Sequence, residues 1–111
     1  MTSPEQRLAA ARAAVAELVA AVTQEGRRGA FWLPRLRDLQ DALGVEDRPA
    51  GQILTDAATL EDLLYAAPRD NFADFYLLTV DPQQRAEQNR RFTAAAETLH
   101  AALSGRDQDR G

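Results

Sequence analysis

The stretch TLEDLLYAAPRDNFADFYLLTV, residues 59–80, decides between two folds for this chain. Its end, FYLLTV at 75–80, is aromatic, aliphatic and β-branched and lies between aspartates, which is typical of a β-strand. A strand cannot stand alone, because its backbone N–H and C=O groups need hydrogen-bond partners. The nearest candidate partner is the segment 62–67, across the polar turn at 68–74. The stretch therefore favours a β-hairpin.

The beginning of the same stretch also supports a helix. Thr59 and Asp62 have the spacing of a capping box, which is typical of a helix N-terminus. If 59–67 is helical, the chain is an all-α bundle, and this fold is the alternative to the hairpin.

A long N-terminal helix is predicted over residues 4–25. Ser3 can cap it, Pro4 suits the first helical position, and Gln6 completes a capping box with Ser3. Gly26 is expected to end the helix. Apolar residues with the helical period of 3.6 form one stripe: Leu8, Ala11, Val15, Leu18 and Val22.

A second long helix is predicted at the C-terminal end. Asp81 is its expected cap, Pro82 takes the first position, and Gln84 completes another capping box. Residues 105–111 are expected to form a disordered tail, which leaves 1–104 as a single domain. The apolar stripe of this helix consists of Phe92, Ala96, Leu99 and Leu103.

Shorter elements are predicted in the middle of the chain. The triplet FWL at 31–33 is expected to be a strand stub that pairs with another strand, and a helix should follow over 34–44. A third helix is expected at about 48–58, with Asp47 as its cap.

The resulting order of helix, strand stub, helix, helix, hairpin and helix resembles that of a winged helix-turn-helix domain. Residues 31–80 carry the resemblance, and LPRLRDLQDALGV at 33–45 resembles the second helix and turn of such domains in its leucine spacing and glycine. The resemblance implies a mainly α fold with a small β-hairpin (α+β), winged-helix-like, with long N- and C-terminal helices. It also implies that the helix at 48–58 enters the major groove of DNA and that the loop at 68–74 is the wing.

The charge of the segment 38–62 departs from this family. It holds seven acidic residues against one basic residue, Arg48, in a chain of net charge −4. Phosphate contacts supply most nonspecific affinity for DNA, and an acidic face repels them. We therefore expect a small, non-enzymatic interaction module that binds a protein through this acidic face. The partner-binding residues would be Asp38, Asp41, Asp47 and Asp56.

A DNA-binding transcriptional regulator of the winged helix-turn-helix type is the alternative function. Arginine and glutamine side chains can contact phosphates or base edges. The residues available for this role are Arg27, Arg28, Arg35, Arg37, Arg48, Gln52 and Arg69.

The two terminal helices predict a homodimer. Their alanine-rich apolar stripes are more than a short winged core can easily cover, and small side chains permit close helix packing. The residues expected to contribute are Leu8, Val15, Leu18, Val22, Phe92, Leu99 and Leu103.

The composition excludes several kinds of site. The chain has no cysteine, which excludes disulfides, thiolate zinc sites and cysteine nucleophiles. The single histidine, His100, borders the apolar stripe near a helix end, where it could interact with the last carbonyls. Acidic pairs such as Asp38 with Asp41 are expected to be a solvated face. We therefore expect no enzymatic activity, metal, cofactor or small-molecule substrate.

The sequence also predicts a cytoplasmic protein without membrane contact. The N-terminal residues lack the basic and apolar pattern of a secretory signal. No apolar segment reaches the ~20 residues that a membrane span needs.

Overall fold

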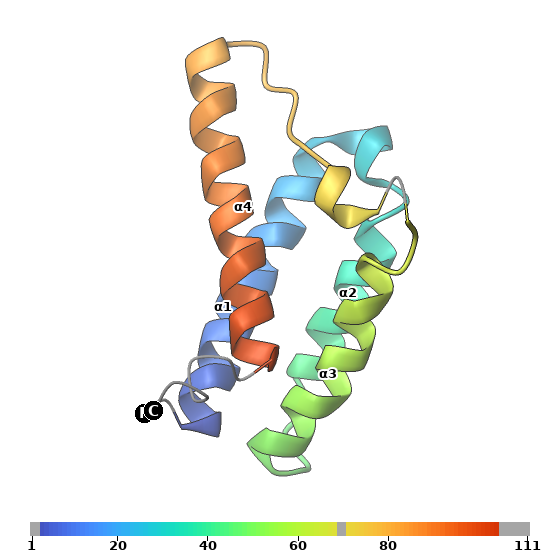
Figure 1. Cartoon of the computed structure of the whole chain (residues 1–111), viewed down its shortest axis with the longest axis vertical. Coiled ribbons are helices and arrows are strands. Elements are labelled where there is room, and N and C mark those ends of the chain that lie inside the picture. The colour runs from blue at the N-terminus through green and yellow to red at the C-terminus, as the bar shows by residue number, and fades with distance from the viewer. Residues whose placement is uncertain (1–2, 69–70, 105–111) are drawn as a thin grey trace.

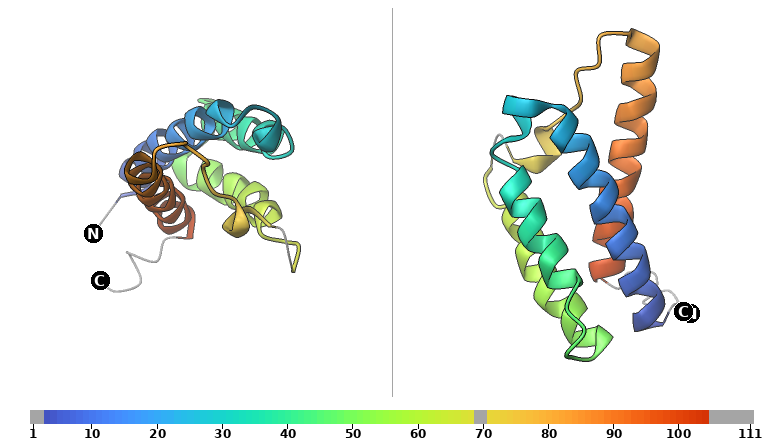
Figure 2. Two further views of the ribbon diagram at one scale, coloured as in Figure 1. Left: turned by 90° about the horizontal axis from the view of Figure 1, so that it is seen from above. Right: turned by 180° about the vertical axis from the view of Figure 1, so that it is seen from behind.

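The computed structural model describes residues 3–68 and 71–104, which fold into a bundle of four α-helices with two short 3-10 turns (Figure 1). The bounds are α1 Pro4–Gln24, η1 Gly26–Gly29, α2 Leu33–Leu43, α3 Ala50–Leu64, η2 Phe72–Asp74 and α4 Pro82–Ser104. Successive helices run in opposite directions, and they follow the order α4, α1, α2, α3 around the bundle (Figure 2). Both 3-10 turns lie toward the end of the bundle where α4 begins.

The ends of the two long helices are set by residues that the sequence identifies. The Ser3 hydroxyl accepts the Gln6 N–H at 3.1 Å, and the Ser3 N–H donates to the Gln6 side chain at 3.0 Å, so the predicted capping box is confirmed. Gly26 follows α1 with φ of 58°, a left-handed conformation that glycine adopts without strain. At the start of α4, the Asp81 carboxylate accepts the Gln84 N–H at 3.0 Å.

The predicted β-hairpin is wrong, and the α+β class with it. Residues 3–68 and 71–104 contain no β-strand, and 62–64 form the last turn of α3. Residues 75–80 are extended, as their composition predicts, but they pair with no other strand. Side chains instead bond both backbone groups of Leu77, the Leu78 N–H and the carbonyls of Thr79 and Val80. The all-helical alternative for the start of the 59–80 stretch is thus the observed one, with the helix ending at Leu64.

The winged-helix-like architecture is wrong for the same reason. The expected wing lacks a hairpin, and the expected strand stub at 31–33 forms a turn that leads into α2. Asp47 is not a helix cap, since α3 begins after Pro49 without a side-chain cap. The bounds of α3 also differ from the expected 48–58, because α3 is one continuous helix of 15 residues.

The core lies along α1, which contacts each of the other three helices. Leucines of α2, α3 and α4 pack against α1 in this core and are almost inaccessible to solvent, among them Leu36, Leu39, Leu54, Leu64 and Leu99. All seven apolar residues predicted to form a dimer are also buried in this core, with 7% exposure or less. These side chains therefore pack inside a single chain.

Two arginines of α1 connect it to the ends of neighbouring helices. Arg12 Nε donates to the Leu43 carbonyl at 2.6 Å, where the last carbonyls of α2 have no helical partner. Arg7 Nε donates to the Ala102 carbonyl of α4 at 2.8 Å. These bonds fix the start of α1 against both neighbours.

The turn η1 folds tightly back onto the end of α1. A Cβ atom at Gly29 would lie 2.3 Å from the Val22 carbonyl oxygen, so only glycine fits at this position.

None of the helices in residues 3–68 and 71–104 has the length and apolar character that a membrane span requires. The expected tail at 105–111 lies outside the described residues.

Candidate functional site

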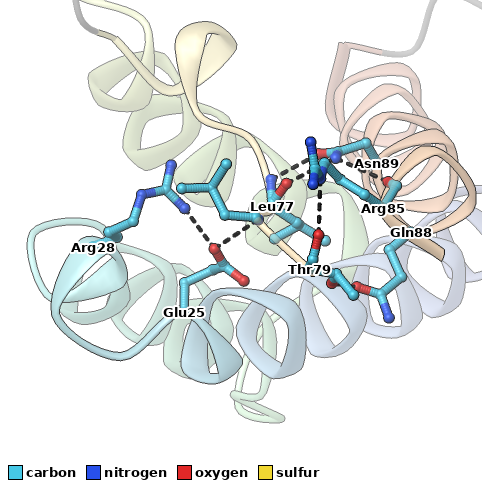
Figure 3. A network of polar contacts seen from close by, with 8 residues as sticks. Glu25, Arg28, Leu77, Thr79, Arg85, Gln88 and Asn89 are labelled. Carbon is cyan, nitrogen blue, oxygen red and sulfur yellow. Dashed lines mark hydrogen bonds and ion pairs between the residues drawn. The ribbon is translucent and has the colours of Figure 1, made fainter. Parts of the chain in front are cut away.

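An extended segment, residues 75–80, connects η2 to α4, and we call it the strap (Figure 3). Its side chains alternate, as they do in a β-strand. Leu77 is 3% exposed and packs into the core, whereas Tyr76, Leu78 and Val80 are 53%, 47% and 91% exposed. One face of the strap therefore presents three apolar side chains to solvent.

The strap is anchored to α4 by side chains that take the place of a neighbouring strand. The Leu77 N–H donates to Asn89 Oδ1 at 2.7 Å, and Asn89 Nδ2 donates to the Leu77 carbonyl at 2.9 Å (Figure 3). Arg85 donates to the Thr79 carbonyl at 2.8 Å and to the Val80 carbonyl at 3.1 Å. The Thr79 hydroxyl also donates to the side chain of Gln88, which completes the contact with α4.

The strap is also anchored to the end of α1. Glu25, the C-cap residue of α1, accepts the Leu78 N–H at 3.0 Å and forms an ion pair with Arg28 of η1 (Figure 3). The Arg28 guanidinium lies 5.3 Å from the Phe75 ring centroid and 5.1 Å from that of Tyr76, within the range of cation–π contacts. These contacts hold the strap against α1 and α4, although it is not part of a sheet.

A second feature is an aromatic groove of about 600 Å³ between the end of α3, η2 and α4. Its walls include four aromatic side chains: Tyr65, Phe72, Phe75 and Phe92. Their rings contact one another, with Phe72 at 5.5 Å from Phe92 and 6.1 Å from Tyr65 between centroids. Its lining residues come from the C-cap of α3, the segment from η2 to Phe75, and α4, and α3 and α4 are neighbours in the ring of helices (Figure 2).

A buried carboxylate lies beside this groove. Glu61 of α3 is 2% exposed, and its carboxylate lies 3.1 Å from Nδ1 of His100, which lines the groove. Burial raises the pKa of Glu61, and the neighbouring His100 partly opposes that rise. Burial and the Glu61 charge raise the pKa of Tyr65 to about 12, so the phenol is neutral at physiological pH. Of the described acidic residues, Glu97 is the one that lines the groove itself.

The four aspartates predicted to bind a partner lie on α2, on α3 and in the connection between them. Arg48 lies between Asp47 and Asp56, with N···O distances of 3.2 and 2.9 Å, so two of the four aspartates have an arginine partner. The hydrogen bond to Asp56, followed by the charge of Asp47, raises the pKa of Arg48. Asp38 and Asp41 lie on the exposed surface of α2.

The described residues predicted for DNA binding are distributed over η1, α2, the α2–α3 connection and α3. Gln52 is exposed in the first turn of α3, while Arg48 is engaged by aspartates. Arg35 lies over the exposed ring of Phe31, 3.8 Å from its centroid. The others are Arg27 and Arg28 in η1, Arg37 on the exposed side of α2, and Arg69, which lies outside the described residues.

The sequence analysis did not single out Asn89, which anchors the strap, or Glu61, which lies beside the aromatic groove. Asn89 carries one available signal, since it is an amide one turn before Phe92 on the partly buried side of a helix. Glu61 carries another, because it occupies a core position of α3, four residues after Ala57 and three before Leu64. A carboxylate on an apolar stripe needs a partner, and His100 is the only histidine in the chain.

No protein-family model, curated protein or solved structure matches this chain.

Proposed function

We propose that this chain is a non-enzymatic protein-interaction module that binds its partner through the outer face of the strap. The observation that carries the proposal is the group of exposed apolar side chains Tyr76, Leu78 and Val80 on a segment whose backbone is anchored at both sides. Exposed apolar groups that lie together mark interaction surfaces more often than scattered ones do.

Two properties of the strap suit it to protein binding. Its backbone is held by Asn89, Arg85 and Glu25, so a partner does not have to order a flexible loop. Its surface combines Tyr76 with the neighbouring Arg28, and tyrosine and arginine are enriched in protein–protein interfaces.

A second copy of the chain is the simplest partner to test. The apolar stripes of α1 and α4 are buried within one bundle, so a homodimer needs another surface. Leu78 and Val80 can supply apolar contacts there. This proposal keeps the expected dimer but moves its interface from the terminal helices to the strap.

Replacing Val80 with glutamate tests the proposal, because a side chain that is 91% exposed can be changed without disturbing the core. Leu63→Glu is a matched control, since Leu63 is 60% exposed on α3. Sedimentation velocity over a concentration series reports self-association. A photo-crosslinking residue at position 80, compared with one at position 63, reports any other bound protein.

We expect association or crosslinking in the wild type that Val80→Glu abolishes and Leu63→Glu leaves unchanged. The proposal is wrong if the wild type is monomeric and the two crosslinking positions capture the same proteins. It is equally wrong if Val80→Glu associates as the wild type does.

A further inference from the structure

We infer that the aromatic groove between α3, η2 and α4 is a binding site for a small organic cation, that is, an apolar molecule that carries one amine. This inference is independent of the strap, because the outer face of the strap and the groove are lined by different side chains.

The shape and walls of the groove suit a small apolar molecule. Its volume of about 600 Å³ falls within the roughly 300–1,000 Å³ that small-molecule sites occupy. Tyr65 and Phe75 are only partly buried, so parts of their rings are accessible. An aromatic ring face attracts a cation through its quadrupole, which adds to the burial of apolar surface.

The charges around the groove favour a cation over an anion. Glu97 is the acidic residue among the described residues that line the groove, and the Glu61 carboxylate lies 3.1 Å from Nδ1 of His100, another lining residue. Among the described residues, no arginine lines the groove. An anion in the groove would meet the repulsion of Glu97.

The contact with Glu61 also determines what His100 offers to a ligand. A carboxylate accepts hydrogen bonds, so in the neutral imidazole the Nδ1–H donates to Glu61. In this tautomer the proton is on Nδ1, so Nε2 carries a lone pair. Nε2 can therefore accept a hydrogen bond from an ammonium group. A protonated amine would thus meet an acceptor on His100 and a negative charge on Glu97, with its apolar part against the aromatic rings.

Three ligands of the same length and different charge test this inference: phenylbutylamine, phenylbutanol and phenylbutyrate. Titrations followed by amide chemical shifts place each ligand on the chain. The single tryptophan, Trp32, is a second reporter, because its ring centroid lies 5.3 Å from that of Phe72. We expect the amine to bind about tenfold more tightly than the carboxylate, since opposite charges attract and like charges repel at such distances.

Substitutions locate the origin of the preference. Glu97→Gln should reduce the ratio of amine to carboxylate affinity by at least about threefold, whereas Glu87→Gln, an exposed glutamate earlier on α4, should leave it unchanged. Ala96→Phe should fill part of the groove and weaken all three ligands, with circular dichroism confirming that the bundle is intact.

Three results would overturn the inference. One is a carboxylate that binds as tightly as the amine. Another is an amine preference that Glu97→Gln and Glu87→Gln affect equally. The last is an absence of shifts at groove residues with any of the three ligands.

Discussion

Replacing Asn89 with alanine is expected to release the strap from the bundle and to lower the free energy of unfolding substantially. The Asn89 amide satisfies both backbone groups of Leu77, at 2.7 and 2.9 Å, and also donates to the Arg85 carbonyl at 2.9 Å. Each partly buried backbone group that loses its partner costs about 1–2 kcal/mol. Alanine returns about 0.5 kcal/mol through its higher helix propensity. With both Leu77 groups left unpaired, the net loss should be about 1.5–3.5 kcal/mol.

Urea unfolding followed by circular dichroism measures this loss, and amide hydrogen exchange locates it. In the wild type the Leu77 N–H should exchange slowly, and in Asn89→Ala it should exchange at the rate of an exposed loop. Asn89→Asp should lose at least as much stability at neutral pH, because its carboxylate keeps the acceptor for the Leu77 N–H but faces the Leu77 carbonyl. Thr98→Ala, an exposed change on the same helix, controls for helix propensity.

Two results together would show that Asn89 does not hold the strap in place. If Asn89→Ala costs less than about 0.5 kcal/mol, the effect is that of an ordinary surface substitution. If the Leu77 N–H also remains protected, the strap is held by contacts other than the Asn89 amide.

Three further predictions concern other parts of the bundle. Gly29→Ala should destabilise by about 2 kcal/mol or more, measured by urea unfolding, because a Cβ there meets the Val22 carbonyl at 2.3 Å; an unchanged midpoint would contradict the tight turn. His100→Ala leaves the Glu61 carboxylate without its partner, so unfolding should be easier by about 1–3 kcal/mol at neutral pH. Burial raises the pKa of Glu61, so the folded state favours the protonated carboxyl. The stability lost in His100→Ala should therefore shrink as the pH falls through the pKa of Glu61. A loss of stability that does not depend on pH would contradict this role of Glu61. Arg12→Met keeps the aliphatic stem but removes the hydrogen bond to the last turn of α2, at an expected cost of about 1 kcal/mol, and it should speed amide exchange there; uniform exchange would show that the bond is unimportant.

The sequence predicts the parts of this fold that depend on local chemistry. The capping box of Ser3 and Gln6, the glycine after α1 and the aspartate before α4 each act within a few residues of their own position. The apolar stripes of α1 and α4 also follow from helical periodicity, which is why the long helices and their buried faces are correct.

The strap could not be predicted from such local patterns. The prediction assumed that an extended segment must pair with another strand, and the observed partner of Leu77 is the side chain of Asn89, 12 residues further along the chain. The backbone requirement was right, but the identity of the partner depends on how α4 lies against α1.

The end of α3 was misassigned for a related reason. Glu61 interrupts the apolar stripe of α3, so the helical period is harder to recognise beyond Ala57. Only the packing of α3 beside α4 shows that His100 is the hydrogen-bond partner of this buried carboxylate.

The order of the helices around the bundle has a consequence for folding kinetics. The first and last helices are neighbours, tied at one end by Arg7 to the carbonyl of Ala102, a separation of 95 residues. Until α4 docks, the apolar stripe of α1 is covered on one side only, by α2 and α3. Closing such a long loop is slow in comparison with forming each helix. The docking of α4, with the strap it draws into place, is therefore expected to limit the folding rate, and substitutions at the α1–α4 contact should slow refolding more than those between α2 and α3.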